Sequence, residues 1–203
     1  MVSETVNSGH CSLFTFHCFT FHWSVIKGSL RLTALSKKIC LLGDFAVGKT
    51  SLVRRFVYNR FEDKYLSTIG VKVSSKMVVV AGQNQPTEVT MMIWDLAGSE
   101  EFNSVRSSYL RGTSGAILVC DLTRAETLPR LLMYVEELAR VKNTIPIIMA
   151  ANKSDLINDL QLSQDEVNQF AVSVNAPCYR TSAKFGDEVE TLFRHLAWLM
   201  VNR

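Results

Sequence analysis

The sequence lacks the concentration of basic residues that nucleic-acid binding requires. Its 22 Lys and Arg residues nearly balance 19 Asp and Glu residues, so the formal net charge is only +3, and no segment is densely basic. Because contact with a phosphate backbone depends on clustered cations, we expect no nucleic-acid partner. The 203 residues, 47% of them hydrophobic, are enough for one domain with a substantial core.

The sequence also lacks an apolar run that could span a bilayer. The apolar stretch 11–26 is shorter than the ~20 residues that a membrane helix needs, contains two histidines and has no basic segment before it. A signal peptide is therefore not expected. Residues 1–36 carry only three charges but hold three of the four histidines. We expect them to form an N-terminal extension, disordered or outside the fold. A weak membrane-surface segment, or residues upstream of the true start, remain the alternatives.

The five cysteines show no pairing pattern. Cys40, Cys120 and Cys178 lie inside or beside apolar, strand-like runs, which favours buried free thiols in a reducing compartment. No cysteine follows Cys178, so we expect no prenyl anchor. The corresponding expectation is a cytoplasmic protein that meets membranes only through partner proteins.

From residue 37 onward, short apolar runs alternate with helical patterns. Apolar spacing predicts helices over 128–139 and 189–200, and Ser163 followed by Glu166 is a capping-box signature. A further helix is expected over 49–58. The expected strands are 39–42, 71–80, 87–94, 115–120, 145–150 and 178–180.

This order of elements predicts the fold class. Alternating strands and helices favour parallel pairing with right-handed crossovers, whereas the segments 71–80 and 87–94 predict a hairpin. We expect an α/β fold with a doubly wound, mostly parallel six-stranded sheet, helices on both faces and one antiparallel edge strand. Residues 37–203 should form this single domain, with its ligand at the carboxyl ends of the strands.

A glycine-rich segment, GDFAVGKTS, follows the first expected strand and opens the first expected helix. It matches the phosphate-loop pattern G-x-x-x-x-G-K-[ST], in which backbone N–H groups and the helix N-terminus face phosphate oxygens. Lys49 should reach the β- and γ-phosphates, and the Thr50 hydroxyl should ligate Mg²⁺. The pattern alone indicates a nucleoside triphosphate without choosing the base. The expected contacts are Gly43, Asp44, Phe45, Ala46, Val47, Gly48, Lys49, Thr50 and Ser51.

Two later tetrapeptides, each directly after a predicted strand, indicate guanine. Asp155 in NKSD can accept hydrogen bonds from N1–H and the 2-amino group of guanine, and adenine offers neither donor. TSAK follows the strand 178–180. Either tetrapeptide alone could be an ordinary turn, but both in order after the phosphate loop favour a guanine site. The expected base contacts are Asn152, Lys153, Asp155, Ser182, Ala183 and Lys184.

From residue 37 to the end, the sequence resembles the Ras superfamily of small GTPases, most closely its Rab branch. The resemblance rests on GDFAVGKTS, YLSTIG, WDLAGSE, SSYLRG, NKSD and TSAK, in this order. It implies a P-loop G domain that binds GTP and GDP with Mg²⁺. Exchange factors and effectors would bind through segments 61–73 and 94–111, which respond to the nucleotide. A monomer is expected.

The resemblance also assigns roles to single residues. It implies that Thr68 and Asp95 complete the Mg²⁺ site with Thr50, and that Phe61 packs against guanine. Gly98 corresponds to the glycine whose N–H meets the γ-phosphate. The implied catalytic set is Lys49, Thr68, Gly98 and Ser99.

Three positions depart from the family pattern. Ser99 stands where family members carry the glutamine that orients the attacking water, so hydrolysis should be slow, although Glu100 or Glu101 could substitute. Phe45 occupies a position that prefers small residues, and its ring either crowds the γ-phosphate or turns away. Rab proteins also carry an aromatic triad. Here Trp94 and Tyr109 are present, but Val73 stands at the first position in place of phenylalanine.

We therefore expect a guanine-nucleotide switch with weak GTPase activity. The alternative is a GTP-loaded interaction module that does not hydrolyse. A P-loop ATPase or kinase is disfavoured by Asp155 and by the lack of a lid or second-substrate segment.

Overall fold

The computed structural model describes residues 33–62, 67–68, 70–98 and 103–203. The chain divides into a unit of residues 1–31 and a unit of residues 32–203, and only the second is described below. Its elements are β1 Thr33–Leu42, α1 Lys49–Tyr58, β2 Val71–Ala81, β3 Pro86–Leu96, α2 Asn103–Leu110, β4 Gly115–Asp121, η2 Ala125–Thr127, α3 Leu131–Val141, β5 Ile147–Asn152, η3 Ile157–Asp159, α4 Gln164–Ser173, β6 Cys178–Thr181 and α5 Val189–Asn202.

Within the described residues, the strands form one six-stranded sheet in the order β2-β3-β1-β4-β5-β6. Strands β3, β1, β4, β5 and β6 run parallel, and β2 pairs antiparallel with β3 at the edge. The predicted fold class is confirmed. Because parallel strands end at the same edge of a sheet, the loops after β1, β3, β4, β5 and β6 meet there.

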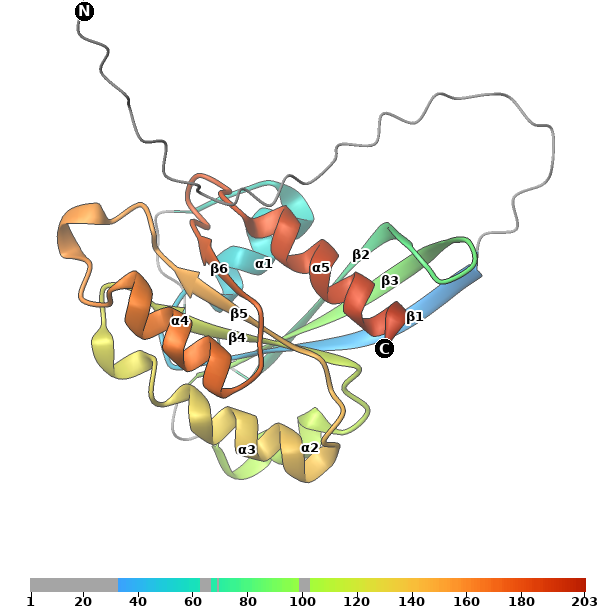
Figure 1. Cartoon of the computed structure of the whole chain (residues 1–203), viewed down its shortest axis with the longest axis horizontal. Helices are drawn as coiled ribbons and strands as arrows, with labels where there is room; N and C mark the ends of the chain where they lie inside the picture. Colours follow the sequence, from blue (N-terminus) through green and yellow to red (C-terminus); the bar gives the residue numbers. More distant parts are fainter. Residues whose placement is uncertain (1–32, 63–66, 69, 99–102) are drawn as a thin grey trace, which may run out of the picture. The chain divides into compact units, whose positions relative to one another are not determined.

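Helices cover both faces of the sheet (Figure 1). Side chains of α1 and α5 share one core cluster with the strands, and those of α2, α3 and α4 share the other. The pleat of β1 explains this division, because Ile39 and Leu41 enter the first cluster while Cys40 and Leu42 enter the second. All four are buried, and such a two-sided strand reads as a continuous apolar run.

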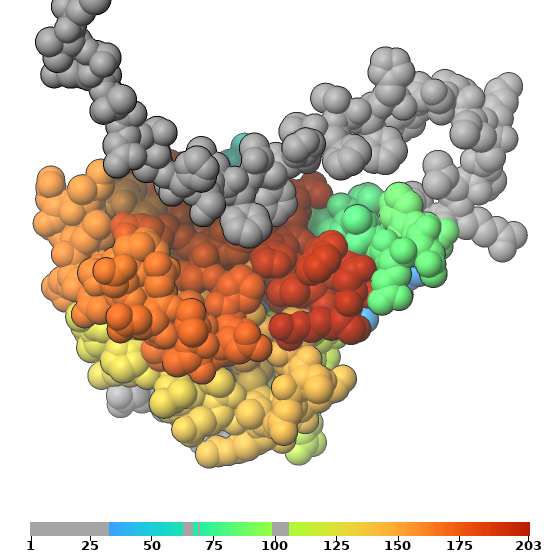
Figure 2. Space-filling model, in the orientation of Figure 1, coloured from blue at the N-terminus to red at the C-terminus, as the bar shows by residue number. Residues whose placement is uncertain are grey.

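Helix α5 also runs along the edge hairpin, as Figure 2 shows for the red helix and the neighbouring green β2–β3 turn. Lys76 pairs with Glu190 at 3.0 Å, Arg194 donates to the Val79 carbonyl at 3.2 Å, and Asn202 donates to the Ala81 carbonyl at 2.9 Å. These contacts attach the antiparallel edge strand to the rest of the domain. Across the described ranges, no helix has both the length and the apolar character to cross a bilayer.

Several element boundaries differ from the sequence-based expectation. Strand β1 begins at Thr33, four residues before the expected start of the domain, because residues 33–36 pair with residues 87–90 of β3. Strand β5 begins at Ile147 rather than at residue 145, after Pro146, which has no N–H to donate. It continues to Asn152, which pairs with Asp121.

The third helix also starts later than its apolar stripe suggests. Leu128 and Pro129 form a tighter turn, in which the N–H groups of Leu131 and Leu132 bond three residues back, and α3 begins only at Leu131. Other expectations hold. The hydroxyl of Ser163 and the carboxylate of Glu166 form the predicted capping box, and the start of α1 at Lys49 agrees with the sequence.

Candidate functional site

The loop between β1 and α1 is held so closely that two of its glycines cannot be replaced without strain. Gly43 and Gly48 have φ values of 144° and 100°. A Cβ at Gly43 would collide with the Val119 carbonyl oxygen of β4, and one at Gly48 with the Asn152 side chain. The loop therefore rests against the ends of β4 and β5, and the N-terminus of α1 opens beside it.

The Lys49 side chain is buried inside this loop, and its hydrogen bonds within the described residues go to backbone carbonyls. Its Nζ donates to the carbonyl oxygens of Gly43 and Asp44, both at 2.7 Å. Burial lowers the pKa of Lys49 to about 8, and the carboxylates of Asp95 and Asp44 act in the opposite direction. A buried ammonium group at the N-terminus of a helix is suited to an anionic ligand.

Three oxygen-bearing side chains meet beside Lys49. The Thr50 hydroxyl lies 2.8 Å from the Thr68 hydroxyl and donates to Asp95 Oδ2 at 2.6 Å. Asp95 is almost fully buried, and its Oδ1 finds no hydrogen-bond partner among the described residues. Burial raises the pKa of this carboxyl group, while the bond from Thr50 lowers it.

This oxygen cluster fits a hard divalent cation. Two hydroxyls and a carboxylate are the donor types that Mg²⁺ accepts, and the unpartnered buried oxygen of Asp95 is an atom that a cation, directly or through water, would satisfy. The predicted metal residues Thr50, Thr68 and Asp95 are therefore brought together by the fold.

Gly98 follows β3 and passes directly over the phosphate loop. A Cβ at this position would lie 2.6 Å from both Lys49 Nζ and the Asp44 carbonyl oxygen, so only glycine allows the approach. The next residue, Ser99, and the two glutamates at 100 and 101 lie outside the described residues. The predicted role of Ser99 therefore stays a prediction.

Asn152, at the end of β5, connects the phosphate loop to the TSAK segment. Its Nδ2 donates to the Val47 carbonyl at 2.9 Å, and its Oδ1 accepts from the Thr181 hydroxyl at 3.2 Å and the Ala183 N–H at 3.3 Å. All of these groups are buried. The first residue of NKSD is thus structural support shared by three loops.

The other residues of NKSD and TSAK differ in their burial and in their contacts. Ser182, fully buried, donates to Asp155 Oδ1 at 2.7 Å and so orients this carboxylate. Lys153 has φ of 66°, and its Nζ lies 2.5 Å from Asp121 Oδ2 rather than standing free. Lys184 is exposed beside Phe185.

One cavity of about 290 Å³ unites these parts. Its wall includes most of the predicted site residues: Phe45, Ala46, Gly48, Lys49, Thr50, Ser51, Phe61, Thr68, Gly98, Asn152, Lys153, Asp155, Ala183 and Lys184. The remaining described ones support this wall from behind through the contacts given above: Gly43, Asp44, Val47, Asp95 and Ser182.

Other residues of the site were not predicted from the sequence. Arg54 and Glu62, which form an ion pair at 2.6 Å, line the cavity together with Leu96 and Leu156. Asp121 contacts Lys153 without lining the cavity. Its position directly after the apolar run 115–120 could have indicated it, because a polar residue at the carboxyl end of a parallel strand faces the ligand edge.

Trp94 and Tyr109, the two aromatic members of the expected triad, lie close together. Trp94 and Tyr109 have ring centroids 6.3 Å apart, and Lys38 Nζ lies 4.0 Å from the Trp94 centroid while donating to the Tyr109 carbonyl. Val73 is 44% exposed and pairs across the hairpin with Trp94. Both aromatic rings are partly buried against the second core cluster, so part of their role is packing.

The sequence is similar to known proteins across this site. The model of the Ras family matches residues 38–202. GTP-binding protein ypt4 of Schizosaccharomyces pombe is 34% identical over 168 residues, which cover 82% of this chain and 72% of that protein. Ras-related protein Rab-21 of Homo sapiens is 37% identical over 169 residues, covering 83% and 73%. Rab-21 of Mus musculus gives the same identity, covering 83% and 74%.

Proposed function

This chain belongs to the Ras family of small GTPases, in its Rab branch, and we propose that it is a switch that binds GTP and GDP with Mg²⁺ and hydrolyses GTP slowly. Family membership supports a GTP-binding molecular switch with GTPase activity in general. The Mg²⁺ requirement, the slow rate and the individual residue roles are the parts we add.

One observation carries the proposal. The buried ammonium of Lys49 and the Ser182-oriented carboxylate of Asp155 line the same cavity. We take the first as its phosphate end and the second as its base end. A nucleotide placed along the cavity would meet cationic and N–H groups with its phosphates and an acceptor with its base. Guanine has two N–H donors that the Asp155 carboxylate can accept from, at N1 and the 2-amino group, whereas adenine has neither.

In this proposal, Thr50, Thr68 and Asp95 would hold Mg²⁺, which would supply positive charge to offset that of the nucleotide's phosphates. Thr68 comes from the segment 61–73, so its hydroxyl ties that segment to the phosphate end. The Gly98 N–H ties segment 94–111 to the same end. Both segments are therefore the proposed surfaces for exchange factors and effectors, and we propose that the chain acts as a monomer.

Two residues argue for slow hydrolysis. A serine at position 99 is shorter than glutamine and lacks the amide that holds a water and a phosphate oxygen together. Phe45 lines the cavity with 45% of its surface exposed, and a bulky ring at this wall would obstruct an arginine brought in by a partner. Binding contacts are unaffected by either residue, and the barrier to hydrolysis is raised.

The exposed ring of Phe45 also favours a second candidate, a GTP-loaded interaction module that does not hydrolyse. Nucleotide extracted from the purified full chain separates the candidates. Bound GDP, or GDP with GTP, supports the slow switch. GTP alone, with no phosphate release over days, supports the module, and an adenine nucleotide would contradict both.

A further inference from the structure

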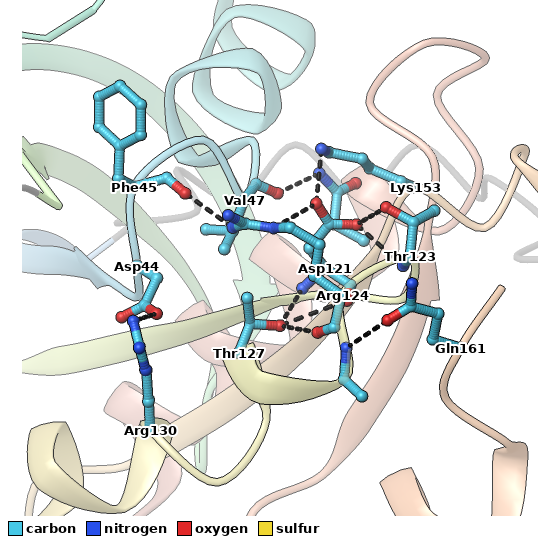
Figure 3. Close-up of polar contacts among 12 residues, drawn as sticks. Asp44, Phe45, Val47, Asp121, Thr123, Arg124, Thr127, Arg130, Lys153 and Gln161 are labelled. Atoms are coloured by element: carbon cyan, nitrogen blue, oxygen red, sulfur yellow. Dashed lines mark hydrogen bonds and ion pairs between the residues drawn. The ribbon is translucent and has the colours of Figure 1, made fainter. Parts of the chain in front are cut away.

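Two arginines outside the cavity wall hold the phosphate loop at consecutive residues. Arg124, directly before η2, donates from Nη2 to the Phe45 carbonyl at 2.7 Å, and Arg130 donates from Nη1 to Asp44 Oδ2 at 2.9 Å (Figure 3). Residues 44 and 45 are thereby tied to a segment 79 to 86 positions later in the chain. In the same view the Phe45 ring points away from Arg124.

Arg124 is anchored as well as bonded. Its Nε donates to Asp121 Oδ2 at 3.2 Å, and Asp121 is fully buried. The same carboxylate accepts from the N–H and hydroxyl of Thr123, at 3.0 and 2.7 Å, and pairs with Lys153 at 2.5 Å. A buried carboxylate with this many donors has one fixed position, so it also fixes the guanidinium.

The turn that carries Arg124 is equally constrained. The Thr127 hydroxyl donates to the Arg124 carbonyl at 2.7 Å and accepts from the Asp121 N–H at 3.0 Å. Gln161 accepts from the Ala125 N–H at 3.2 Å. The guanidinium therefore reaches the phosphate loop from a rigid base, which is the condition for a positioning contact.

The contact requires arginine rather than a positive charge alone. Nε and Nη2 of the planar guanidinium point at two acceptors, Asp121 and the Phe45 carbonyl, which lie on different segments. A lysine is a point charge on a flexible stem, so it would pair with the Asp121 carboxylate and lose the bond to the Phe45 carbonyl. Lys153 binds the same carboxylate, so the chain Lys153–Asp121–Arg124–Phe45 links the base motif to the phosphate loop.

We propose that Arg124, with Arg130 beside it, is a positioning residue that clamps the phosphate loop at residues 44–45 and thereby slows nucleotide release. The inference rests on the proposed guanine-nucleotide function and names a residue that retains the ligand without touching it. Arg124 bridges two segments and is about one-third exposed, whereas Arg130 is mostly exposed. Arg124 should therefore have the larger effect.

The test compares four variants of the full chain: R124A, R124K, R130A and the control R140A, which removes an exposed arginine paired only loosely with Glu136 at 3.9 Å. Release of a fluorescent GDP analogue and amide hydrogen exchange of residues 44–48 are both measured. We expect release about tenfold faster in R124A, most of that change in R124K, and about two- to threefold in R130A. R140A should match the native chain.

R124K keeps a cation beside Asp121, so it separates the contact with Phe45 from any loss of folding. Faster release together with faster exchange at 44–48 in both Arg124 variants supports the clamp. Release within twofold of the native rate overturns it, as does faster release with unchanged loop exchange and a lowered melting temperature. If the native chain binds no guanine nucleotide, the proposed function fails. The exchange comparison, made on the ligand-free chain, then supports or overturns the clamp by itself.

Discussion

The two ends of the cavity differ in how they are built. At the base end, Asn152 and Ser182 are buried and hydrogen-bonded, and the segments NKSD and TSAK carry the resemblance to the family. At the phosphate end, Lys49 and the Thr50–Thr68–Asp95 cluster are intact, but Phe45 and Ser99 depart from it. In the proposed function, ground-state binding uses the intact groups, whereas hydrolysis needs the positions that depart from the pattern. We therefore expect this protein to bind the nucleotide tightly while hydrolysing GTP slowly.

The largest expected effect lies at the base end. Asp155→Asn replaces the acceptor for N1–H and the 2-amino group, so we expect GTP and GDP affinity to fall about 100-fold or more, since a site built for hydrogen bonds rejects an unmatched partner strongly. Xanthine nucleotides, whose O2 accepts a donor, should bind better than guanine ones. Competition binding of GDP and xanthosine diphosphate measures this.

Asp159→Asn, on the exposed η3 turn, is the matched control and should leave both affinities unchanged. Unchanged GDP affinity in Asp155→Asn would show that Asp155 does not bind the base. It would also contradict the proposed contrast between the base end and the phosphate end of the cavity.

At the phosphate end, metal removal is the next largest effect. If Thr50, Thr68 and Asp95 hold Mg²⁺, chelation should speed GDP release by about tenfold or more, because charge on the β-phosphate loses its counterion. Thr50→Ala should release GDP quickly and respond little to chelation. Stopped-flow release with and without EDTA checks both statements.

Thr90→Ala, within β3, is the control for Thr50→Ala, and EDTA should speed its GDP release as much as in the native chain. A native chain that releases GDP at one rate whether or not Mg²⁺ is present would contradict the metal site.

Phe45→Gly is expected to act in the opposite sense and less strongly. Removing the ring opens space beside the γ-phosphate, so intrinsic hydrolysis should rise several-fold at most while GDP affinity changes little, since the Phe45 carbonyl that accepts from Arg124 is retained. Single-turnover hydrolysis and GDP titration of the same preparation separate the two quantities. A large loss of affinity would mean that the ring contacts the nucleotide.

The smallest effect concerns the N-terminal residues. A shortened chain beginning at residue 32 should bind GDP like the full chain, because the phosphate loop and both base motifs follow it. One beginning at residue 37 loses the pairing of residues 33–36 with β3 and should melt roughly 2–4 °C lower. Weaker GDP binding from residue 32 would assign residues 1–31 to the domain.

The sequence predicted the features that depend on local patterns. The phosphate loop, the capping box at Ser163 and the two base motifs are short, and each lies directly after a strand or before a helix, so their residues could be placed without the structure. The shift of β5 to Ile147 follows from its pairing with β4, which apolar spacing alone does not specify. The clamp of Arg124 on Phe45 was unpredictable for a stronger reason. It joins segments 79 positions apart through a backbone carbonyl. Every residue type has such a carbonyl, so the sequence does not reveal which one accepts the bond.

The central claim is that this protein retains GTP well and turns it over slowly because Ser99 cannot orient water. Single-turnover GTP hydrolysis tests it most directly, in the native chain, Ser99→Gln and Ser99→Ala. Ras, a relative that carries the glutamine, hydrolyses GTP unaided at roughly 10⁻⁴ s⁻¹. We expect the native chain to hydrolyse GTP at least about tenfold more slowly than Ras. Ser99→Gln should raise the rate about tenfold at unchanged GTP affinity, and Ser99→Ala should leave the rate unchanged. A native rate equal to that of Ras, abolished by Ser99→Ala, would make Ser99 a catalytic residue and contradict the account.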